Sequence, residues 1–444
     1  MIFKYSEHIL FVIRRNISSK YDKFRDSWRR VNLKDSDIYA YSAYYDDRRR
    51  TVSAKEGNDP VVRINVIGPK EFKTKYSNTR CVIRFENGSF RVVMISVIEM
   101  LESFSLKWNS FYVNCRLKQM VTLPKMREAN HLPNENSANN TKHNSDGDIV
   151  AVTLVSADNL ADISYKLSNP EINVHKLKPS QPLEYNERGG KSGNVTTPFA
   201  ICVKPIHLHW NRAIWLLEFV EMYRIMGATQ FFIYYYSAGP DVLKVLDYYS
   251  RAKLVTILAW RLPPIESQKD IRTQAIFSAL NDCNMRAYVN HFEYAAMVDF
   301  DEFIIPKSAN NLVELLDNIS EKGTPSSGKI GSYSFSNVFF YLYWENDTSV
   351  IDRYWPEFEP SVRNQTELER NVSKEKDNMR PIPPYLLTQM KIKRTSKPHP
   401  YGRRSKYIVK PEGVVLAGNH IVHKFADGFR GHNVKTDVGL SHHY

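Results

Sequence analysis

The chain has 444 residues, of which 42% are hydrophobic, 12% aromatic and 25% charged. This composition is typical of a folded globular protein and excludes an intrinsically disordered chain, and the length predicts two domains. The net charge of +13 favours anionic partners such as nucleic acid, membrane surfaces or phosphorylated substrates, although the basic residues are spread along the chain.

The first segment, residues 1–59, is polar and charged with little apolar periodicity, which predicts a poorly structured leader. No stretch approaches the ~20 apolar residues that a helix needs to cross a bilayer. The short apolar run at 8–13 is also a poor signal peptide. These residues alone predict a soluble, untargeted chain without an anchor, unless its natural amino terminus lies upstream.

Residues 60–177 are expected to form a β-rich amino-terminal domain. Strand-like runs occur at 61–68, 80–97, 110–117 and 148–156. Asn87-Gly88 inside the second run is a hairpin signal. Residues 178–197 are rich in turn formers and are interpreted as a linker.

The four cysteines leave their pairing open. Cys81 and Cys115 fall in two of the strand-like runs and could join them, and Cys202 and Cys283 lie further on. Four cysteines allow three pairings, and two disulfides or four buried thiols fit the spacing equally. No CxxC pair occurs, so we expect no zinc site.

Beyond the linker, strand and helix patterns alternate. Strands are expected at 199–206, 230–236, 253–260 and 294–305, and helices at 213–228, 241–252 and 267–288. This alternation predicts an α/β domain over 198–444, with a parallel sheet covered on both faces. Ligands of such sheets bind beyond the carboxyl ends of the strands.

Asp299 and Asp301 stand at such an end, after an apolar run. Strand alternation would turn both carboxylates to one side and Phe300 into the core. Two adjacent carboxylates repel each other unless a cation lies between them. Mn²⁺ or Mg²⁺ would accept these oxygens and leave coordination sites for phosphate. The pair is a candidate metal site that orients a nucleotide diphosphate, and the alternative is two solvated side chains.

The segment "VDFDEFIIP" resembles the DxDEF signature of glycosyltransferase family 92. Further segments between 198 and 444 are similar to other blocks of that family: "CVKPIHLHWNRAIWLLEFVEMYRIMGATQFFIYYYS", "VLDYYSRAKLVTILAWRLP", "LNDCNMRAY", "RRSKYIVKPEGVVLAGNHIVHKF" and "SHHY". The resemblance implies a glycosyltransferase-A (Rossmann-like) catalytic domain. It also implies metal-dependent, inverting transfer of a hexose, galactose in characterised members, from a UDP-sugar to a glycan or glycoprotein acceptor.

Family members are typically single-pass Golgi membrane proteins. The resemblance therefore implies a lumenal catalytic domain and membrane association in the Golgi or secretory pathway, although no anchor is visible in this chain. Eight Asn-x-Ser/Thr sequons fit a glycoprotein of that pathway.

The resemblance also implies site residues. It carries Asp299 and Asp301 over as metal and UDP ligands. Glu302 belongs to the same motif, but strand alternation would point it to the opposite face. This suggests that it supports the metal ligands from behind or stabilises the fold. His420 is the candidate third metal ligand. Three other histidines are alternatives to it: His423, His442 and His443.

Basic residues near these strand ends are candidates to neutralise a diphosphate as UDP leaves. Lys204 follows the first strand of the catalytic domain. Lys406 and Arg403, with Arg404, lie in "GRRSKYIVK". The alternative is an ordinary solvated basic loop.

An inverting transfer needs a base that removes the proton of the acceptor hydroxyl. Glu345 and Asp347 follow the aromatic cluster "FFYLYW", on which a sugar ring could stack. We expect one of them to be the base, Glu345 first.

Two other classes of function compete with the enzyme. One is a non-catalytic glycan-binding or scaffold protein on a degenerate transferase fold. The other is a nucleic-acid-binding protein, but the chain contains no recognition motif, so we expect no nucleic-acid partner.

Overall fold

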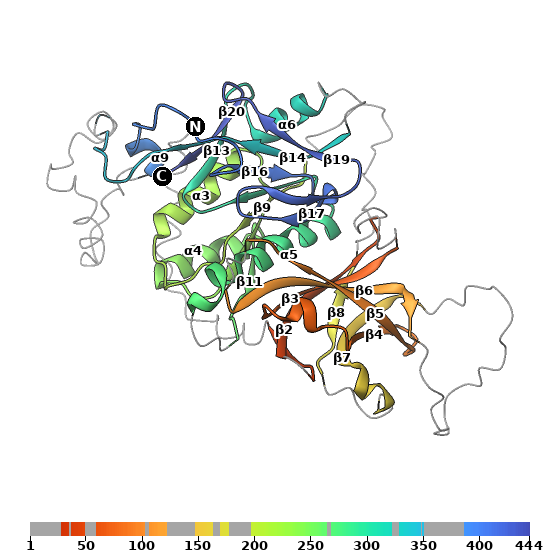
Figure 1. The fold of residues 1–444 in the computed structure, drawn as a ribbon. Coiled ribbons are helices and arrows are strands. Elements are labelled where there is room, and N and C mark those ends of the chain that lie inside the picture. Colours follow the sequence, from red (N-terminus) through yellow and green to blue (C-terminus); the bar gives the residue numbers. More distant parts are fainter. Residues whose placement is uncertain are drawn as a thin grey trace, which may run out of the picture.

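The computed structural model describes residues 28–34, 37–48, 59–102, 106–121, 147–162, 169–176, 197–263, 268–321, 328–347, 349 and 386–444. Within these ranges no helix has both the length and the apolar character needed to cross a membrane. Figure 1 shows the strands β2 to β8 gathered in one part of the molecule and the helices around a second sheet in the other.

The amino-terminal sheet has eight strands in the order β1-β2-β3-β6-β5-β4-β7-β8. These strands are β1 (Arg29–Asn32), β2 (Asp37–Asp46), β3 (Val61–Pro69), β4 (Thr79–Phe85), β5 (Phe90–Glu99), β6 (Trp108–Met120), β7 (Ile149–Ser156) and β8 (Ile172–His175). Each pairs antiparallel with its neighbours, and β8 also pairs with β2, so β2 to β8 close into a barrel. The short helices α2 (Phe72–Lys75) and η2 (Ala157–Asp162) lie in the connections.

The predicted hairpin of this domain is confirmed, and one cysteine pairing that the sequence left open is resolved. The hairpin turn between β4 and β5 falls at Gly88, whose φ of +83° is the left-handed conformation that glycine adopts most easily. A disulfide joins Cys81 on β4 to Cys115 on β6, and both side chains lie in the barrel's hydrophobic core.

The prediction of a poorly structured leader at 1–59 is wrong for residues 29–46, which form β1 and β2. The segment "DIYAYSAYYD" does alternate in burial, with Ile38, Ala40 and Tyr44 inside the protein. Its tyrosines hid this pattern, because tyrosine is suited to either side of a half-buried strand. The other described leader residues, 28, 33–34, 47–48 and 59, belong to no helix or strand, and the rest of the leader lies outside the described residues. The linker predicted at 178–197 also lies outside the described residues, apart from residue 197.

The second sheet has seven strands in the order β11-β10-β9-β12-β16-β14-β19. These strands are β9 (Phe199–Val203), β10 (Gln230–Tyr235), β11 (Val255–Ala259), β12 (Tyr294–Val298), β14 (Lys329–Phe335), β16 (Lys406–Val409) and β19 (Phe429–Val434). The four strands predicted from the alternating pattern are parallel, as expected. The sheet as a whole is mixed, because β16 runs antiparallel to both of its neighbours.

The helices that pack on this sheet follow the prediction in part. They are α3 (Ala213–Ile225), α4 (Pro240–Arg251), α5 (Ile276–Val289) and α6 (Leu312–Glu321). The helix predicted at 267–288 is shorter than expected. Thr273, Gln274 and Ala275 have positive φ angles of 38°, 49° and 59°, which interrupt it, and only short turns, η3 (Gln268–Asp270) and η4 (Arg272–Ala275), precede α5.

Both faces of the sheet are covered, as the alternating pattern predicts. Phe199 and Ile201 of β9 pack in one core with α3 and α4. Ala200 and Cys202 face the opposite core, which contains α5 and residues of the barrel. A disulfide joins Cys202 to Cys283 of α5. Figure 1 shows α5 lying between the sheet and the barrel strands.

One buried carboxylate fixes the barrel to this helix. Asp282 of α5 accepts hydrogen bonds from the hydroxyls of Ser42 and Tyr44 on β2 and of Tyr234 on β10, and it forms an ion pair with Arg286. Burial alone would raise the pKa of Asp282, but the Arg286 charge and these hydrogen bonds lower it. The two domains therefore share a core and a polar network.

Two small sheets complete the carboxyl-terminal domain. A three-stranded sheet has the order β13-β20-β15, and a hairpin pairs two further strands. The strands are β13 (Glu302–Pro306), β15 (Asn337–Phe339), β20 (Gly439–His443), β17 (Val414–Ala417) and β18 (Val422–Phe425), and short helices occur at η7 (Pro411–Gly413) and α9 (Leu387–Met390). The single strand predicted at 294–305 is therefore two strands, β12 and β13, in different sheets.

Candidate active site

The strand register brings a lysine and an aspartate together at the centre of the sheet. Val203 at the end of β9 pairs with Val298 at the end of β12. The next residues, Lys204 and Asp299, therefore leave the sheet side by side, with Lys204 Nζ 3.5 Å from Asp299 Oδ2. The strands β10 and β12 flank β9, so this point is where the strand order reverses and where α/β sheets bind ligands.

Antiparallel pairing brings in two more side chains. Met297 pairs with Tyr407, which places Lys406, the first residue of β16, beside the end of β12. In the small sheet, Glu302 pairs with His443 of β20. Residues on β13, β16 and β20 and directly after β9 and β12 thus converge where β12 turns into β13.

Asp299 and Asp301 do share one target region, but not because of strand alternation. Both lie in the turn between β12 and β13, where Glu302 N donates a hydrogen bond to Asp299 O at 3.1 Å. Phe300 is buried, as predicted, and stacks on Trp210 at 5.0 Å between ring centroids. One carboxylate oxygen from each of Asp299, Asp301 and Glu302 lies within 4.8 Å of the others. We call these three residues the acidic cluster.

The expectation that Glu302 points to the opposite face is wrong. The turn at 299–301 changes the chain direction, so the Glu302 side chain returns to the cluster and accepts a hydrogen bond from Asp299 N at 2.9 Å. Its side chain is only 1% exposed and is 3.0 Å from Lys406 Nζ. Burial alone would raise the pKa of Glu302, but Lys406 and His443 lower it well below its usual range.

Lys406 holds the cluster together from within the protein. Its Nζ is 3.3 Å from Asp299 Oδ2, 3.0 Å from Glu302 Oε2 and 3.2 Å from Asn419 Oδ1. Burial would lower the pKa of this lysine, yet the two carboxylates outweigh burial and raise it. Lys406 is thus a buried cation between two acids, whereas the Lys204 side chain, also paired with Asp299, is 32% exposed.

Asp301 differs from its two neighbours in the cluster. Its Oδ1 atom is buried and accepts no hydrogen bond from the described residues. Burial raises the pKa of Asp301, and the charge of Lys204 counters it only in part. Its other oxygen is 3.9 Å from His443 Nε2. A buried carboxylate oxygen without a donor is the feature of this site that fits a bound cation.

The histidine that reaches the cluster is His443, one of the three alternatives to His420. His443 Nδ1 is 3.2 Å from Glu302 Oε1, and the charges of Glu302 and Asp301 raise its pKa although burial lowers it. Both ring nitrogens of His420 have other neighbours: Ser405 O at 3.2 Å and Asn419 Nδ2 at 3.1 Å. His423 is 2.7 Å from Glu102.

The residues expected to supply the base do not join the cluster through any contact within the described part of the chain. The Glu345 side chain is 86% exposed and forms an ion pair with Lys393 at 2.8 Å, which lowers its pKa. Asp347 accepts a hydrogen bond from Ser349 N. Arg403 and Arg404 are exposed in the turn that precedes β16.

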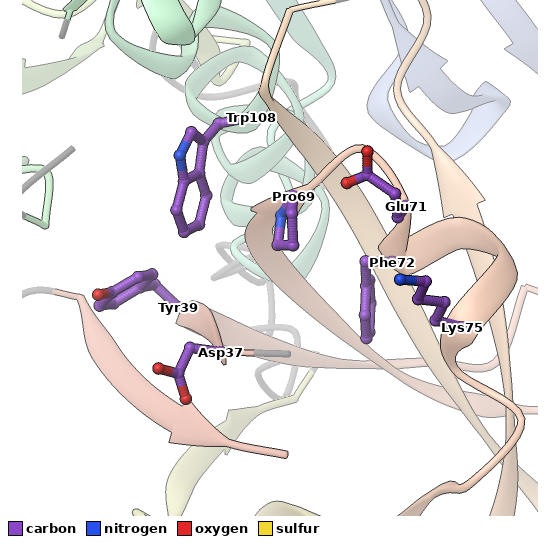
Figure 2. A pocket seen from close by; sticks show the side chains of 7 residues that line it. All are labelled: Asp37, Tyr39, Pro69, Glu71, Phe72, Lys75 and Trp108. Atoms are coloured by element: carbon purple, nitrogen blue, oxygen red, sulfur yellow. The ribbon is translucent and has the colours of Figure 1, made fainter. Parts of the chain in front are cut away.

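A separate hollow of about 400 Å³ opens on the barrel, away from the acidic cluster. Figure 2 shows the side chains around it: Asp37, Tyr39, Pro69, Glu71, Phe72, Lys75 and Trp108. It contains none of the residues that the sequence singled out, so the candidate site is the cluster and not this hollow.

The acidic cluster lies in the part of the chain that matches a protein-family model. The sequence model described as glycosyltransferase family 92 matches residues 197–444, more than half of the chain and the whole of the second sheet. A curated protein of Caenorhabditis elegans named beta-1,4-galactosyltransferase galt-1 is 25% identical over 296 residues, which are 66% of this chain and 57% of that protein.

A second curated relative from the same organism is named as a glycosyltransferase family 92 protein. It is 27% identical over 162 residues, 32% of this chain and 31% of that protein. The chain therefore spans about half or less of the length of these relatives.

Proposed function

The chain belongs to glycosyltransferase family 92, and from that premise we propose that it transfers a hexose from a UDP-sugar to a glycan acceptor, with galactose as the first candidate for the hexose. We further propose that the transfer inverts the anomeric centre and depends on Mn²⁺ or Mg²⁺. The name of the galactosyltransferase relative supports the choice of sugar. The observation that carries the proposal is the acidic cluster at the point where the strand order reverses.

We assign the catalytic domain to the glycosyltransferase-A fold. The parallel strands β11-β10-β9-β12 support a Rossmann-like arrangement, because β9, the first of them along the chain, lies between β10 and β12. The helices α3 and α4 connect them on one face, while α5 covers the other.

The residues present fit a divalent cation. Asp301 offers a buried oxygen that accepts no hydrogen bond from the described residues, Asp299 and Glu302 supply neighbouring carboxylates, and His443 is a nearby nitrogen ligand. A bound Mn²⁺ or Mg²⁺ would neutralise diphosphate oxygens and stabilise UDP as a leaving group.

The chain's own residues have separable tasks in this proposal. Lys204, partly exposed beside Asp299, contacts the diphosphate and offsets its charge as it leaves. Lys406 keeps Asp299 and Glu302 in place, because its amine already bridges both carboxylates. Glu345 and Asp347 remain our predictions for the base, although the ion pair with Lys393 makes Glu345 a weaker base than a free glutamate.

We propose that the protein works in the secretory pathway, at the Golgi membrane. Two disulfides support an oxidising compartment. Two of the sequon asparagines, Asn87 and Asn318, are exposed and could carry glycans.

One observation favours the competing function, a non-catalytic glycan-binding or scaffold protein. Lys204 and Lys406 already offset the charge of Asp299, so the cluster is partly neutralised by the chain itself. A screen of nucleotide-sugars with Mn²⁺, read as the nucleoside diphosphate released, separates the two functions. UDP release from UDP-galactose supports the enzyme, whereas no release from any donor, with or without acceptor glycans, supports the non-catalytic protein.

A further inference from the structure

A row of aromatic rings begins at the acidic cluster and ends in solvent. The rings of Phe339 and His443 have centroids 4.7 Å apart, since these residues pair in the register of β15 and β20. Phe339 stacks on Tyr341 at 5.5 Å and 3°, and Tyr341 stacks on Tyr343 at 5.1 Å and 26°. Trp344 packs edge-on against Tyr341 at 5.0 Å. We call Phe339, Tyr341, Tyr343 and Trp344 the aromatic ladder.

The ladder combines the end of a strand with a turn. Phe339 ends β15 and Tyr341 follows two residues later, so extended backbone turns both rings to one side. A turn at 342–344, in which Trp344 N donates a hydrogen bond to Tyr341 O at 3.0 Å, then brings Tyr343 and Trp344 against Tyr341. Phe340 takes the opposite side, where it is buried and stacks on Tyr444 at 4.6 Å. The buried side thus fixes the orientation of the segment, and the other side presents the rings.

The ladder is also held in place by polar contacts. The buried Lys391 donates hydrogen bonds through Nζ to the carbonyl oxygens of Leu342 and Trp344. Thr395 N donates to Phe339 O at 2.9 Å, and Asp347 N donates to Met390 O at 2.8 Å. The rings therefore stand on a segment whose backbone is tied to residues 390–395.

A second anchor ties that neighbouring segment to the core. The buried carboxylate of Glu218 on α3 accepts hydrogen bonds from the backbone N–H groups of Leu387 and Thr388, at the start of α9. The aromatic ladder is therefore ordered before any ligand binds, which lowers the conformational entropy lost on binding.

The outer end of the ladder exposes apolar surface that is not packed inside the protein. The Tyr343 ring is 79% exposed and Leu342 is 41% exposed. Exposed apolar surface on a well-anchored segment beside a candidate active site is typical of a binding surface. Beside it lies the exposed Glu345–Lys393 ion pair, which offers both an acceptor and donors to ligand hydroxyls.

We propose that the aromatic ladder is the acceptor subsite, and that Tyr343 stacks its outward face on the C–H face of a pyranose ring of the acceptor saccharide, while Phe339 and Tyr341 support it from behind. This inference rests on the proposed function, because Phe339 at the inner end of the ladder packs against His443, which contacts Asp301 and Glu302. Flat rings match the C–H face of a sugar, and the Glu345–Lys393 pair matches its equatorial hydroxyls.

The test compares Tyr343→Ala with Tyr343→Phe in the full chain. Loss of the ring is expected to raise the KM for the acceptor by roughly 3- to 10-fold, while the KM for the UDP-sugar stays within about twofold. Tyr343→Phe keeps the stacking face and is expected to stay near wild type. Phe90→Ala is the matched control, since Phe90 is 50% exposed on the barrel strand β5, outside the ladder.

A binding experiment keeps the inference testable without turnover. Saturation-transfer NMR with methyl glycosides of common hexoses is expected to show contacts for wild type and Phe90→Ala that Tyr343→Ala lacks. Failure of the proposed function would appear as no UDP release in wild type, whether or not these contacts occur. Equal saccharide contacts and equal acceptor KM in wild type and Tyr343→Ala would overturn the ladder proposal alone.

Discussion

His443 lies opposite Glu302 in the antiparallel pairing of β13 with β20, with its Nδ1 atom 3.2 Å from Glu302 Oε1. The same ring is 3.9 Å from Asp301 and packs against Phe339. One residue of β20 therefore contacts both the acidic cluster and the aromatic ladder. The strand β20 contributes to the candidate site as directly as β12 does.

Asp301→Asn is expected to abolish UDP-sugar turnover while changing the free energy of unfolding by no more than about 1 kcal/mol. The Asp301 oxygen Oδ1 accepts no hydrogen bond within the described residues and burial raises its pKa, so its charge does not stabilise the fold. Transfer assays and urea unfolding measure the two effects. The control is Asp427→Asn at an exposed turn, and full turnover by Asp301→Asn would contradict the assignment.

Glu302→Gln and Lys406→Met are each expected to lower the free energy of unfolding by about 3 kcal/mol, because each leaves a buried charge without its closest partner. The double variant should lose less than the sum of the two single losses. Urea unfolding of all four proteins gives the coupling energy. Strict additivity would mean that the two buried side chains do not stabilise each other.

Asp46 makes stability depend on acid. It is buried on β2 beside Arg48 and Arg63. Burial alone would raise the pKa of Asp46, but the two guanidinium groups lower it from 3.8 to about 2. Because the folded pKa lies below the unfolded one, the stabilisation is fully present above about pH 4 and is lost as the pH falls toward 2.

The variant Asp46→Asn removes that titration. At neutral pH it is expected to be less stable than wild type by about 2 kcal/mol or more. The difference should narrow below pH 4, where wild type loses the contribution of this carboxylate. Unfolding curves at pH 7, 5, 4 and 3 test this, and a constant difference at every pH would show that Asp46 does not titrate as described.

Replacing Cys202 and Cys283 together by alanine is expected to lower the free energy of unfolding by about 2–4 kcal/mol. The affinity for UDP should also fall. Cys202 fixes β9 to α5, and Lys204, the proposed diphosphate contact, directly follows β9. The pair Cys81 and Cys115 is the control, since it joins strands of the barrel. Equal UDP affinity in both double variants and wild type would separate the disulfide from the site.

The sequence singled out four residues that the structure brings together, Asp299, Asp301, Lys204 and Lys406, but it did not predict the positions of Glu302 and His443. Asp299 and Asp301 follow a clear apolar strand, so local patterns suffice to find them. The convergence of Glu302 with His443 depends on the register between β13 and β20, which are far apart in the chain. No local pattern contains that pairing, so His443 stood only among the alternatives.

The same limit explains the errors in the fold. The strands β3 to β7 and β9 to β12 were predicted because each has a regular apolar pattern of its own, whereas the short strand β8 was not predicted. The strand β2 was missed because its tyrosines occupy both buried and partly exposed positions. The start of α5 was misplaced because Thr273, Gln274 and Ala275 turn left-handed without a glycine to signal it.

The most direct test of the central claim is a titration of UDP into the purified chain with Mn²⁺ and, separately, with EDTA, for wild type and Asp301→Asn. We predict UDP binding by wild type that requires Mn²⁺ and is lost in Asp301→Asn. UDP binding of equal strength in EDTA, or unchanged Mn²⁺-dependent binding by Asp301→Asn, would contradict the claim that the acidic cluster holds a cation and a nucleotide diphosphate.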